Sequence, residues 1–203
     1  MSKEWGITVK HYFTDNQQET HNRKEISFRF LSIQYTFVTD SGVFSPNDID
    51  LGGIALIEAY LKLNQQGSIL DLGCGYGNVA IILSKILNQQ VTGVDINSRA
   101  VSLAIENNSI NSTACNFLVS DGFQQLNQQF DTILFNPPIH AGKDMYYPLF
   151  QKSYNQLNEG GQLLVVMRKS HGLKSAISFC ESLFKTIEIV HKNKGYFVFK
   201  CSK

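Results

Sequence analysis

Three glycines within five residues form the segment of this sequence whose chemistry is easiest to interpret. They are Gly73, Gly75 and Gly77, and they directly follow a short apolar run that ends at Leu72. Glycine lets the backbone turn sharply and approach a ligand without a clash at Cβ. A helix that begins after such a turn presents free N–H groups, which favour an anionic group. Because nucleotide-binding proteins of many kinds share this arrangement, it predicts a nucleotide-like ligand without identifying it.

Two acidic residues narrow the class of ligand. Dinucleotide-binding loops prefer the spacing G-x-G-x-x-G, whereas here the third glycine comes one residue earlier and Asn78 occupies its place. Asp71 precedes the first glycine, and Asp95 ends the next apolar run. A carboxylate at Asp95 can accept hydrogen bonds from both ribose hydroxyls. Since NAD-dependent enzymes place an acid in the same region, Asp95 indicates a nucleoside without choosing between cofactors.

The third feature is the sequence Asn136-Pro137-Pro138, which follows the apolar run 132–135. Proline fixes φ and has no backbone N–H, so this loop is expected to present rigid carbonyl oxygens. The side chain of Asn136 adds another carbonyl oxygen. Such acceptors suit the two hydrogens of an –NH2 group. They can hold the nitrogen with its lone pair aimed at an electrophile, so orientation and electrostatics are the main catalytic tasks.

These loops need a scaffold of alternating strands and helices. Short apolar or β-branched runs predict strands, and helical patterns between them predict crossovers. The predicted strands are residues 68–72, 91–94, 117–119, 132–135, 162–167, 186–190 and 196–201. The predicted helices are residues 51–63, 78–87, 98–107, 147–157 and 174–184, and residues 26–38 predict a hairpin.

This alternation predicts an α/β fold with a seven-stranded, mostly parallel sheet and helices on both faces. The last two strands are too close for a helical crossover, so the last strand must run antiparallel. We expect one domain over residues 1–203, with a short N-terminal β extension (1–45) and a catalytic core (46–203). Ligands in such sheets bind beyond the carboxyl ends of the strands, where the informative loops lie.

The composition is that of a soluble globular protein, with 43% hydrophobic and 17% charged residues. No apolar run approaches the ~18 residues of a membrane span, and Met1–Lys10 lacks the apolar stretch of a secretory signal. The four cysteines have no metal-ligand spacing. We therefore expect a cytoplasmic, reduced protein without a bound metal or a membrane partner, and most simply a monomer.

The charge is unevenly distributed along the chain. Residues 1–140 hold 8 Lys and Arg against 13 Asp and Glu, whereas residues 141–203 hold 10 against 4. The C-terminal third thus carries a net charge of +6, although the whole chain carries only +1. An ordinary solvated surface can be this basic, and so can the rim of a binding site that faces the phosphates of a ligand.

Taken together, these motifs resemble a known family. The pattern D-x-G-x-G-x-G at residues 71–77 resembles the first motif of class I methyltransferases. With Asp95 and the sequence Asn-Pro-Pro-Ile-His-Ala-Gly at 136–142, the chain is similar to the bacterial small-subunit ribosomal RNA guanine-N2 methyltransferase C family. The upstream segments Gly-Val-Phe-Ser (42–45) and Asp-Leu-Gly (50–52) also resemble that family, and the match covers most of residues 26–203.

The resemblance implies a Rossmann-like class I methyltransferase fold and S-adenosylmethionine as the cofactor. It implies ribosomal RNA or the small ribosomal subunit as partner, with guanine N2 as the methyl acceptor. The implied cofactor-binding residues are Asp71, Gly73, Gly75, Gly77, Asp95, Asp121 and Asn136, with Asp121 at the adenine amino group. The implied catalytic residues are Asn136, Pro137 and Pro138. The expected substrate-binding residues are Phe44, Ile139, His140, Lys143 and Lys169.

The sequence departs from the family in two ways. Members often carry a second, degenerate N-terminal methyltransferase domain, for which this chain has no room, so it resembles the short single-domain members. Amino-methyltransferases usually place an aromatic after Asn-Pro-Pro to stack on the target base, whereas this chain has Ile139. Phe44, Tyr146 or Tyr147 are the alternatives for stacking, and ordinary core packing is the competing role of each.

Three other functions fit parts of the pattern. The same chemistry would serve an amino-methyltransferase that acts on DNA adenine or protein glutamine. An NAD-dependent oxidoreductase would explain Asp95, although the glycine spacing and the Asn-Pro-Pro loop argue against it. A ribosome-assembly factor that binds RNA without turnover would keep the fold but would not need the Asn-Pro-Pro loop.

Overall fold

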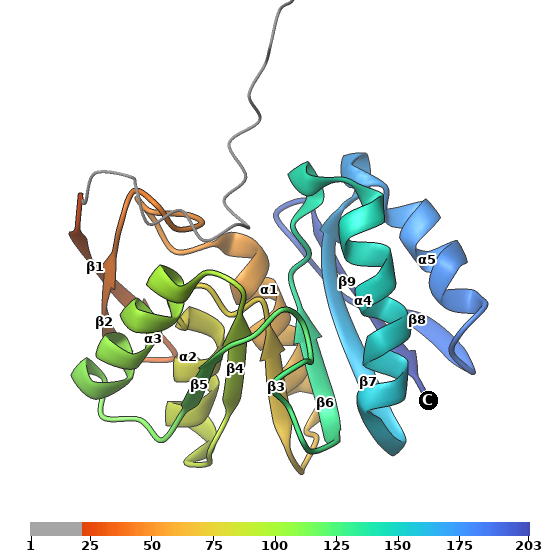
Figure 1. The fold of residues 1–203 in the computed structure, drawn as a ribbon, viewed down its shortest axis with the longest axis horizontal. Coiled ribbons are helices and arrows are strands. Elements are labelled where there is room, and N and C mark those ends of the chain that lie inside the picture. The colour runs from red at the N-terminus through yellow and green to blue at the C-terminus, as the bar shows by residue number, and fades with distance from the viewer. Residues whose placement is uncertain (1–21) are drawn as a thin grey trace, which may run out of the picture.

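The computed structural model describes residues 22–203, so the interpretation of Met1–Lys10 lies outside the described residues. Seven strands form one sheet in the order β5-β4-β3-β6-β7-β9-β8 (Figure 1). Their bounds are β3 (Ile69–Leu72), β4 (Thr92–Asp95), β5 (Asn116–Val119), β6 (Phe130–Phe135), β7 (Leu157–Arg168), β8 (Thr186–Asn193) and β9 (Tyr196–Ser202). The first five run parallel, and β9 lies antiparallel between β7 and β8. The predicted α/β sheet with an antiparallel last strand is therefore confirmed.

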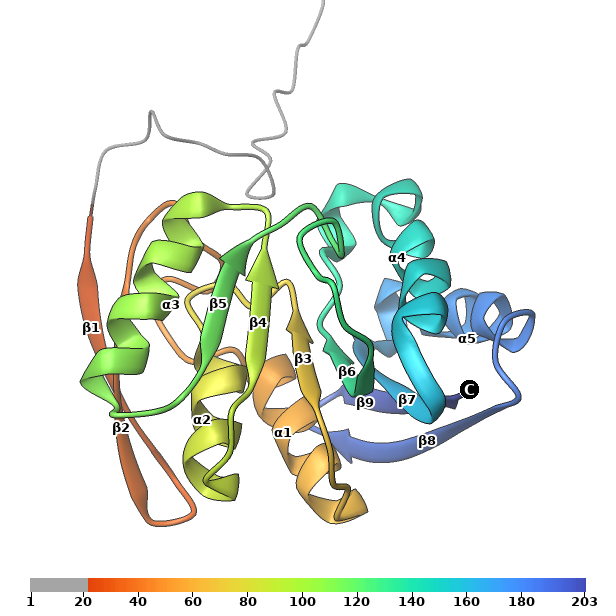
Figure 2. The ribbon, with the colours of Figure 1, turned by 60° about the horizontal axis from the view of Figure 1, so that its bottom comes forward.

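Helices cover both faces of this sheet (Figures 1 and 2). The helices are α1 (Leu51–Leu63), α2 (Asn78–Leu87), α3 (Ser98–Ile110), α4 (Lys143–Gln156) and α5 (Leu173–Glu181). The first three pack with Leu134 and Leu164 in one apolar cluster. The last two pack with Ile133 and Leu163 in the other. Successive residues of β6 and β7 thus point to opposite faces, which explains why these central strands read as continuous apolar runs.

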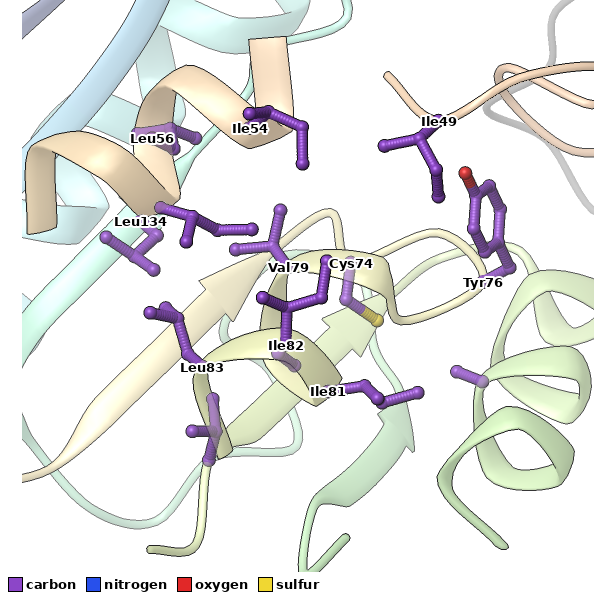
Figure 3. Close-up of a cluster of buried hydrophobic side chains, with 14 of the residues drawn as sticks. Ile49, Ile54, Leu56, Cys74, Tyr76, Val79, Ile81, Ile82, Leu83 and Leu134 are labelled. Atoms are coloured by element: carbon purple, nitrogen blue, oxygen red, sulfur yellow. The ribbon is translucent and has the colours of Figure 1, made fainter. Parts of the chain in front are cut away.

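The core beneath the glycine loop is formed by facing helices. Figure 3 shows Val79 and Leu83 of α2 close to Leu56 of α1 and Leu134 of β6. All four side chains are at least 95% buried. Since burying one such side chain stabilises the fold by about 1.5–3 kcal/mol, this cluster fixes where α2, and hence the loop before it, can lie.

The predicted hairpin forms as β1 (Lys24–Phe30) and β2 (Ile33–Thr39), a separate two-stranded sheet. It is held to α3 by side-chain amides. Asn107 accepts from Val38 N (2.7 Å) and donates to Val38 O (2.9 Å), and Asn111 does the same with Thr36 (3.1 and 2.7 Å). Two amides four residues apart, Asn107 on α3 and Asn111 at its C-cap, therefore occupy the free edge of β2 as a neighbouring strand would.

The expected element bounds differ from the structure mainly around α4 and β7. The helix expected over 147–157 begins at Lys143 and contains Pro148, whose missing N–H removes only one helical hydrogen bond. Leu157 begins β7 rather than ending the helix, and that strand is longer than the expected 162–167. No helix within residues 22–203 is long and apolar enough to cross a membrane.

Candidate active site

A cavity of about 720 Å³ opens at the carboxyl end of the parallel strands. Strand register explains why the motif residues meet there. Leu72 pairs with Phe135 and with Val94, so the loops that follow β3, β6 and β4 emerge side by side. Eleven of the expected site residues line this one cavity: Phe44, Asp71, Gly73, Gly75, Asp95, Asp121, Asn136, Pro137, Pro138, Ile139 and His140.

Two of the three motif glycines face open space in this cavity. Gly73 and Gly75 have φ values of +73° and +55°, and a Cβ added at either would meet no atom within 4 Å. The loop is anchored because the N–H groups of Gly73 and Cys74 both donate to Val94 O, at 2.8 and 2.9 Å. The backbone is thus held by the neighbouring strand while its other side stays open to a ligand.

Gly77 has a different position, because it is absent from the cavity lining and is the N-cap residue directly before α2. Its φ is +87°, and a Cβ there would lie 2.9 Å from Phe117 Cζ and 3.1 Å from Ala104 Cβ. The structure therefore explains this glycine by close packing against α3 and β5. Its expected contact with a cofactor stays a prediction.

Gly77→Ala should destabilise the fold by about 1–3 kcal/mol, because it adds both strain and a packing clash. Gly75→Ala is the matched control, since it also has positive φ but open space around its Cβ. Chemical denaturation of both variants should show a larger loss for Gly77→Ala. Equal losses would mean that the backbone conformation alone requires this glycine.

Asp95 is held in place by backbone donors. Its Oδ2 accepts from Gly75 N and its Oδ1 accepts from Asn97 N, both at 2.9 Å. Burial raises the pKa of Asp95, and these N–H groups oppose the rise. Each carboxylate oxygen keeps further lone pairs, so the side chain can also accept from the two hydroxyls of a ribose.

Asp71 is 4% exposed and accepts a hydrogen bond from Ala80 N at 3.2 Å. Burial raises the pKa of Asp71 to about 7, and the nearby charge of Asp95 acts in the same direction. A carboxylate in this state gains most from a cationic ligand, which would restore its ordinary ionisation. Asp121, by contrast, is exposed and accepts from Gln124 Nε2 at 3.1 Å.

Two buried polar atoms beside the glycine loop have no hydrogen-bond partner among residues 22–203. They are Tyr76 Oη and Asn78 Nδ2, on side chains 2% and 8% exposed, and both residues line the cavity. Buried donors are rarely left unpaired in folded proteins. Asn78 Nδ2 suits the carboxylate of an amino acid, and Asp71 suits its ammonium group. The residues present therefore fit the methionine end of S-adenosylmethionine.

The Asn-Pro-Pro loop follows the buried Phe135, whose ring packs against Phe150 at 5.9 Å. Each of the two proline carbonyls already accepts one hydrogen bond from the chain. Pro137 O accepts from Ile139 N and Pro138 O from Ala141 N, both at 2.9 Å, within the short 3-10 turn Ile139–Ala141. Each carbonyl retains one lone pair, so the loop is rigid and can still accept from a ligand.

Asp50 lines the cavity but was not among the expected site residues, although it directly precedes the expected helix 51–63. It caps α1, accepting from Gly53 N at 2.6 Å, and the same Oδ2 accepts from Asn136 Nδ2 at 2.7 Å. Burial raises the pKa of Asp50, while its hydrogen bonds and the charge of Arg168 oppose that rise. The segment Asp-Leu-Gly at 50–52 was noted as part of the resemblance, but nothing in it indicated a contact 86 residues away.

The three aromatic residues expected to stack on a base lie in different surroundings. Phe44 is 50% exposed and lines the cavity. Tyr146 is 2% exposed and packs on Phe150, and Tyr147 packs on Phe179 with ring centroids 4.6 Å apart. Neither tyrosine is among the lining residues, which favours Phe44 for stacking.

Two cationic side chains, Lys152 and Arg168, line the cavity, and others lie outside it. Arg168 stacks on Tyr196, with its Cζ 4.5 Å from the ring centroid. Tyr196 also lines the cavity, and the sequence did not suggest it as a site residue. Lys169 lines a neighbouring hollow of about 530 Å³, which shares Arg168 with the main cavity. Lys143 lies outside both and donates to Ser175 Oγ at 2.8 Å. Of the expected substrate-binding lysines, only Lys169 adjoins a hollow.

His140 and His171 add to this rim, since both line the cavity with their rings 6.1 Å apart. The floor of the cavity, in contrast, is acidic, with Asp50, Asp71 and Asp95. A cationic small molecule on the floor and a polyanion at the rim would both be matched by this distribution of charge.

Comparisons with known proteins agree with this geometry. The uncharacterized protein YbxB of Bacillus subtilis is 38% identical over 96% of this chain and 98% of its own length. Ribosomal RNA small subunit methyltransferase C of Aliivibrio fischeri is 30% identical over 80% of this chain, which spans about half (48%) of that relative. A solved T. thermophilus 16S rRNA N2 methyltransferase, in complex with AdoMet and guanosine, superimposes with a TM-score of 0.80 at 26% identity, covering 89% of this chain and 50% of that one.

A family model also matches most of the chain. Residues 34–200 match the methyltransferase small domain family, a range that includes the glycine loop, Asp95 and the Asn-Pro-Pro loop. The family and the related structure, which was solved with AdoMet, indicate S-adenosylmethionine as the cofactor. The chain therefore belongs to the methyltransferase small domain family and is an S-adenosylmethionine-dependent methyltransferase.

Proposed function

We propose that this methyltransferase methylates the exocyclic amino group of guanine, N2, in small-subunit ribosomal RNA. One observation carries the proposal: the Asn-Pro-Pro loop and the glycine loop line the same cavity, so an amine acceptor site adjoins the cofactor site. The relatives support the choice of base and polymer, since one was solved with guanosine and others are named for ribosomal RNA.

The chemistry divides between cofactor and protein. S-adenosylmethionine would supply a methyl group on a cationic sulfur: the nitrogen takes the methyl group, the sulfur departs as a neutral thioether, and the proton that the methylated amine loses passes to solvent. Asp95 and Asp71 bind the two ends of the cofactor, and the carbonyl oxygens of Asn136 and Pro137 accept from the two N–H bonds of the target amine. That grip holds the nitrogen lone pair towards the methyl group, which is catalysis by orientation. Phe44 stacks on the base at the cavity mouth.

The proposed role of Asp71 predicts a pH-dependent affinity for the cofactor. With a pKa of about 7, Asp71 is largely protonated below neutrality, whereas the ammonium group at the amino acid end of the cofactor binds its charged form. Affinity should therefore fall as the pH drops from about 7.5 to 5.5, by up to about ten-fold per pH unit.

Titration calorimetry at several pH values measures this linkage directly, and Asp71→Asn is the control. Binding near pH 6.5 should release a proton from the wild type, while the variant should bind more weakly and with a flatter pH dependence. A pH-independent wild-type affinity would remove Asp71 from the methionine end of the site.

The RNA part of the proposal predicts binding that weakens steeply with salt, because lysines neutralise phosphates and release counterions. Lys169→Glu should weaken the binding of ribosomal RNA fragments and reduce the salt slope by about 1 or more, without changing cofactor affinity. Lys185→Glu is the matched control. Lys185 is exposed and directly precedes β8, so it lies at the end of the sheet opposite the cavity. Salt-independent binding, or equal effects of the two variants, would contradict an RNA-binding rim around Lys169.

A paired guanine would hide its amino group, so the target base is expected to be unpaired or flipped out of its stack. The same acceptors would serve DNA adenine or a protein glutamine, which remain the alternative substrates of this chemistry. Labelled methyl transfer to separated RNA, DNA and protein fractions distinguishes them. RNA binding without any methyl transfer would favour the assembly factor instead.

A further inference from the structure

We propose that Asp50 is a positioning residue that sets which way the Asn136 amide faces, so that its carbonyl oxygen points to the substrate amine. The inference rests on the proposed amine methylation and adds a residue to it. It starts from the 2.7 Å contact between Asp50 Oδ2 and Asn136 Nδ2, which joins the N-terminus of α1 to the end of β6.

The direction of the amide follows from the chemistry of the pair. An ionised carboxylate only accepts hydrogen bonds, whereas an amide has a donor end and an acceptor end. The NH2 end of Asn136 must therefore face Asp50, and the carbonyl oxygen must face away. No donor within residues 22–203 is recorded for that oxygen, although the residue lines the cavity. It is therefore available to a ligand.

The acceptor atom on Asp50 is itself held in place by the helix. The oxygen that contacts Asn136 is the one that accepts from Gly53 N at 2.6 Å, so capping α1 fixes its position. Gly52 leaves the room that this arrangement needs. A Cβ there would lie 3.0 Å from Asp50 Oδ2 and 3.4 Å from Asn136 Nδ2. The helix start thus positions a group that faces the reacting nitrogen.

The opposite amide orientation would harm the reaction. It would place the NH2 of Asn136 against the NH2 of the substrate, so that two donors faced each other with no acceptor between them. The substrate nitrogen would lose one of the acceptors that aim its lone pair. A residue that fixes the amide should therefore act on kcat far more than on cofactor affinity.

Three variants separate positioning from folding. Asp50→Ser keeps a good helix cap but is too short to reach Asn136, so kcat should fall at least about ten-fold with little change in cofactor affinity. Asp50→Asn should regain much of that loss, because its amide oxygen, held by Gly53 N, can still accept from Asn136. Asp48→Ser is the matched control, an exposed carboxylate in the same loop that does not line the cavity. A wild-type kcat in Asp50→Ser, or equal losses in the Ser and Asn variants, would overturn the proposal.

A second readout does not depend on the substrate. In 15N-labelled protein, one side-chain N–H of Asn136 should resonate downfield and exchange slowly with water, because it donates to Asp50. That signature should disappear in Asp50→Ser and persist in Asp50→Asn and Asp48→Ser. An Asn136 signal unaffected by Asp50→Ser would refute the positioning role. If the wild-type protein methylates no RNA, guanine methylation fails as a function, and the resonance alone decides the role of Asp50.

Discussion

Replacing Asn136 with alanine is expected to lower kcat by at least about 100-fold, while the affinity for S-adenosylmethionine changes by less than about three-fold. The amide lines the cavity in the loop that follows β6, and its Nδ2 donates to Asp50, which leaves the carbonyl oxygen to accept from the substrate. Its loss removes an acceptor that acts on the orientation of the target nitrogen in the transition state. Single-turnover kinetics with saturating cofactor measures the chemical step directly.

Two measurements complete the test of Asn136. Calorimetry on the same variant establishes that cofactor binding survives, and thermal unfolding establishes that the fold does. Asn127→Ala, an exposed asparagine in the loop before β6, is the control for asparagine removal as such. A kcat near that of the wild type would show that the Asn-Pro-Pro loop does not hold the acceptor amine.

The second large effect is expected for Asp95→Ala, which should weaken S-adenosylmethionine binding by about 1–3 kcal/mol. The side chain would lose its hydrogen bonds to the ribose hydroxyls. It would also release Gly75 N and Asn97 N, which it now holds at 2.9 Å each. Both effects loosen the part of the site that binds the nucleoside. The affinity for S-adenosylmethionine should therefore change more than kcat measured at saturating cofactor.

A fragment of the cofactor separates the two carboxylates. Methylthioadenosine contains the ribose and adenine but lacks the amino acid end. Asp95→Ala should weaken the binding of both ligands, whereas Asp71→Asn should weaken S-adenosylmethionine alone. Unchanged affinity of a folded Asp95→Ala variant for methylthioadenosine would remove Asp95 from the ribose site.

The sequence predicted those parts of the fold that depend on local patterns. Apolar runs separated by helical periods predicted the sheet, and the short link between β8 and β9 required an antiparallel pair. The glycine loop, Asp95 and Asn136 then had to share an edge, because parallel strands place all their following loops at one end. The boundary between an N-terminal extension (1–45) and a core (46–203) stays a prediction.

Other features depend on distant contacts and were beyond local reasoning. Asp50 has the sequence pattern of a helix cap, and only the packing of α1 against the end of β6 brings it to Asn136. Gly77 has the pattern of a ligand-binding glycine, yet its Cα faces Phe117 and Ala104. Tyr146 and Phe44 are both aromatic residues that could stack on a base, and only their exposure, 2% for Tyr146 and 50% for Phe44, separates them.

The most direct test of the central claim is nucleoside analysis of small-subunit ribosomal RNA after incubation with the protein and isotopically labelled S-adenosylmethionine. Digestion to nucleosides and mass spectrometry identify the atom that receives the label, and the Asn136→Ala protein supplies the background. We predict label in N2-methylguanosine with the wild type and none with the variant. Label on a ring carbon or a ribose oxygen, or equal label with both proteins, would contradict methylation of an exocyclic amine held by the Asn-Pro-Pro loop.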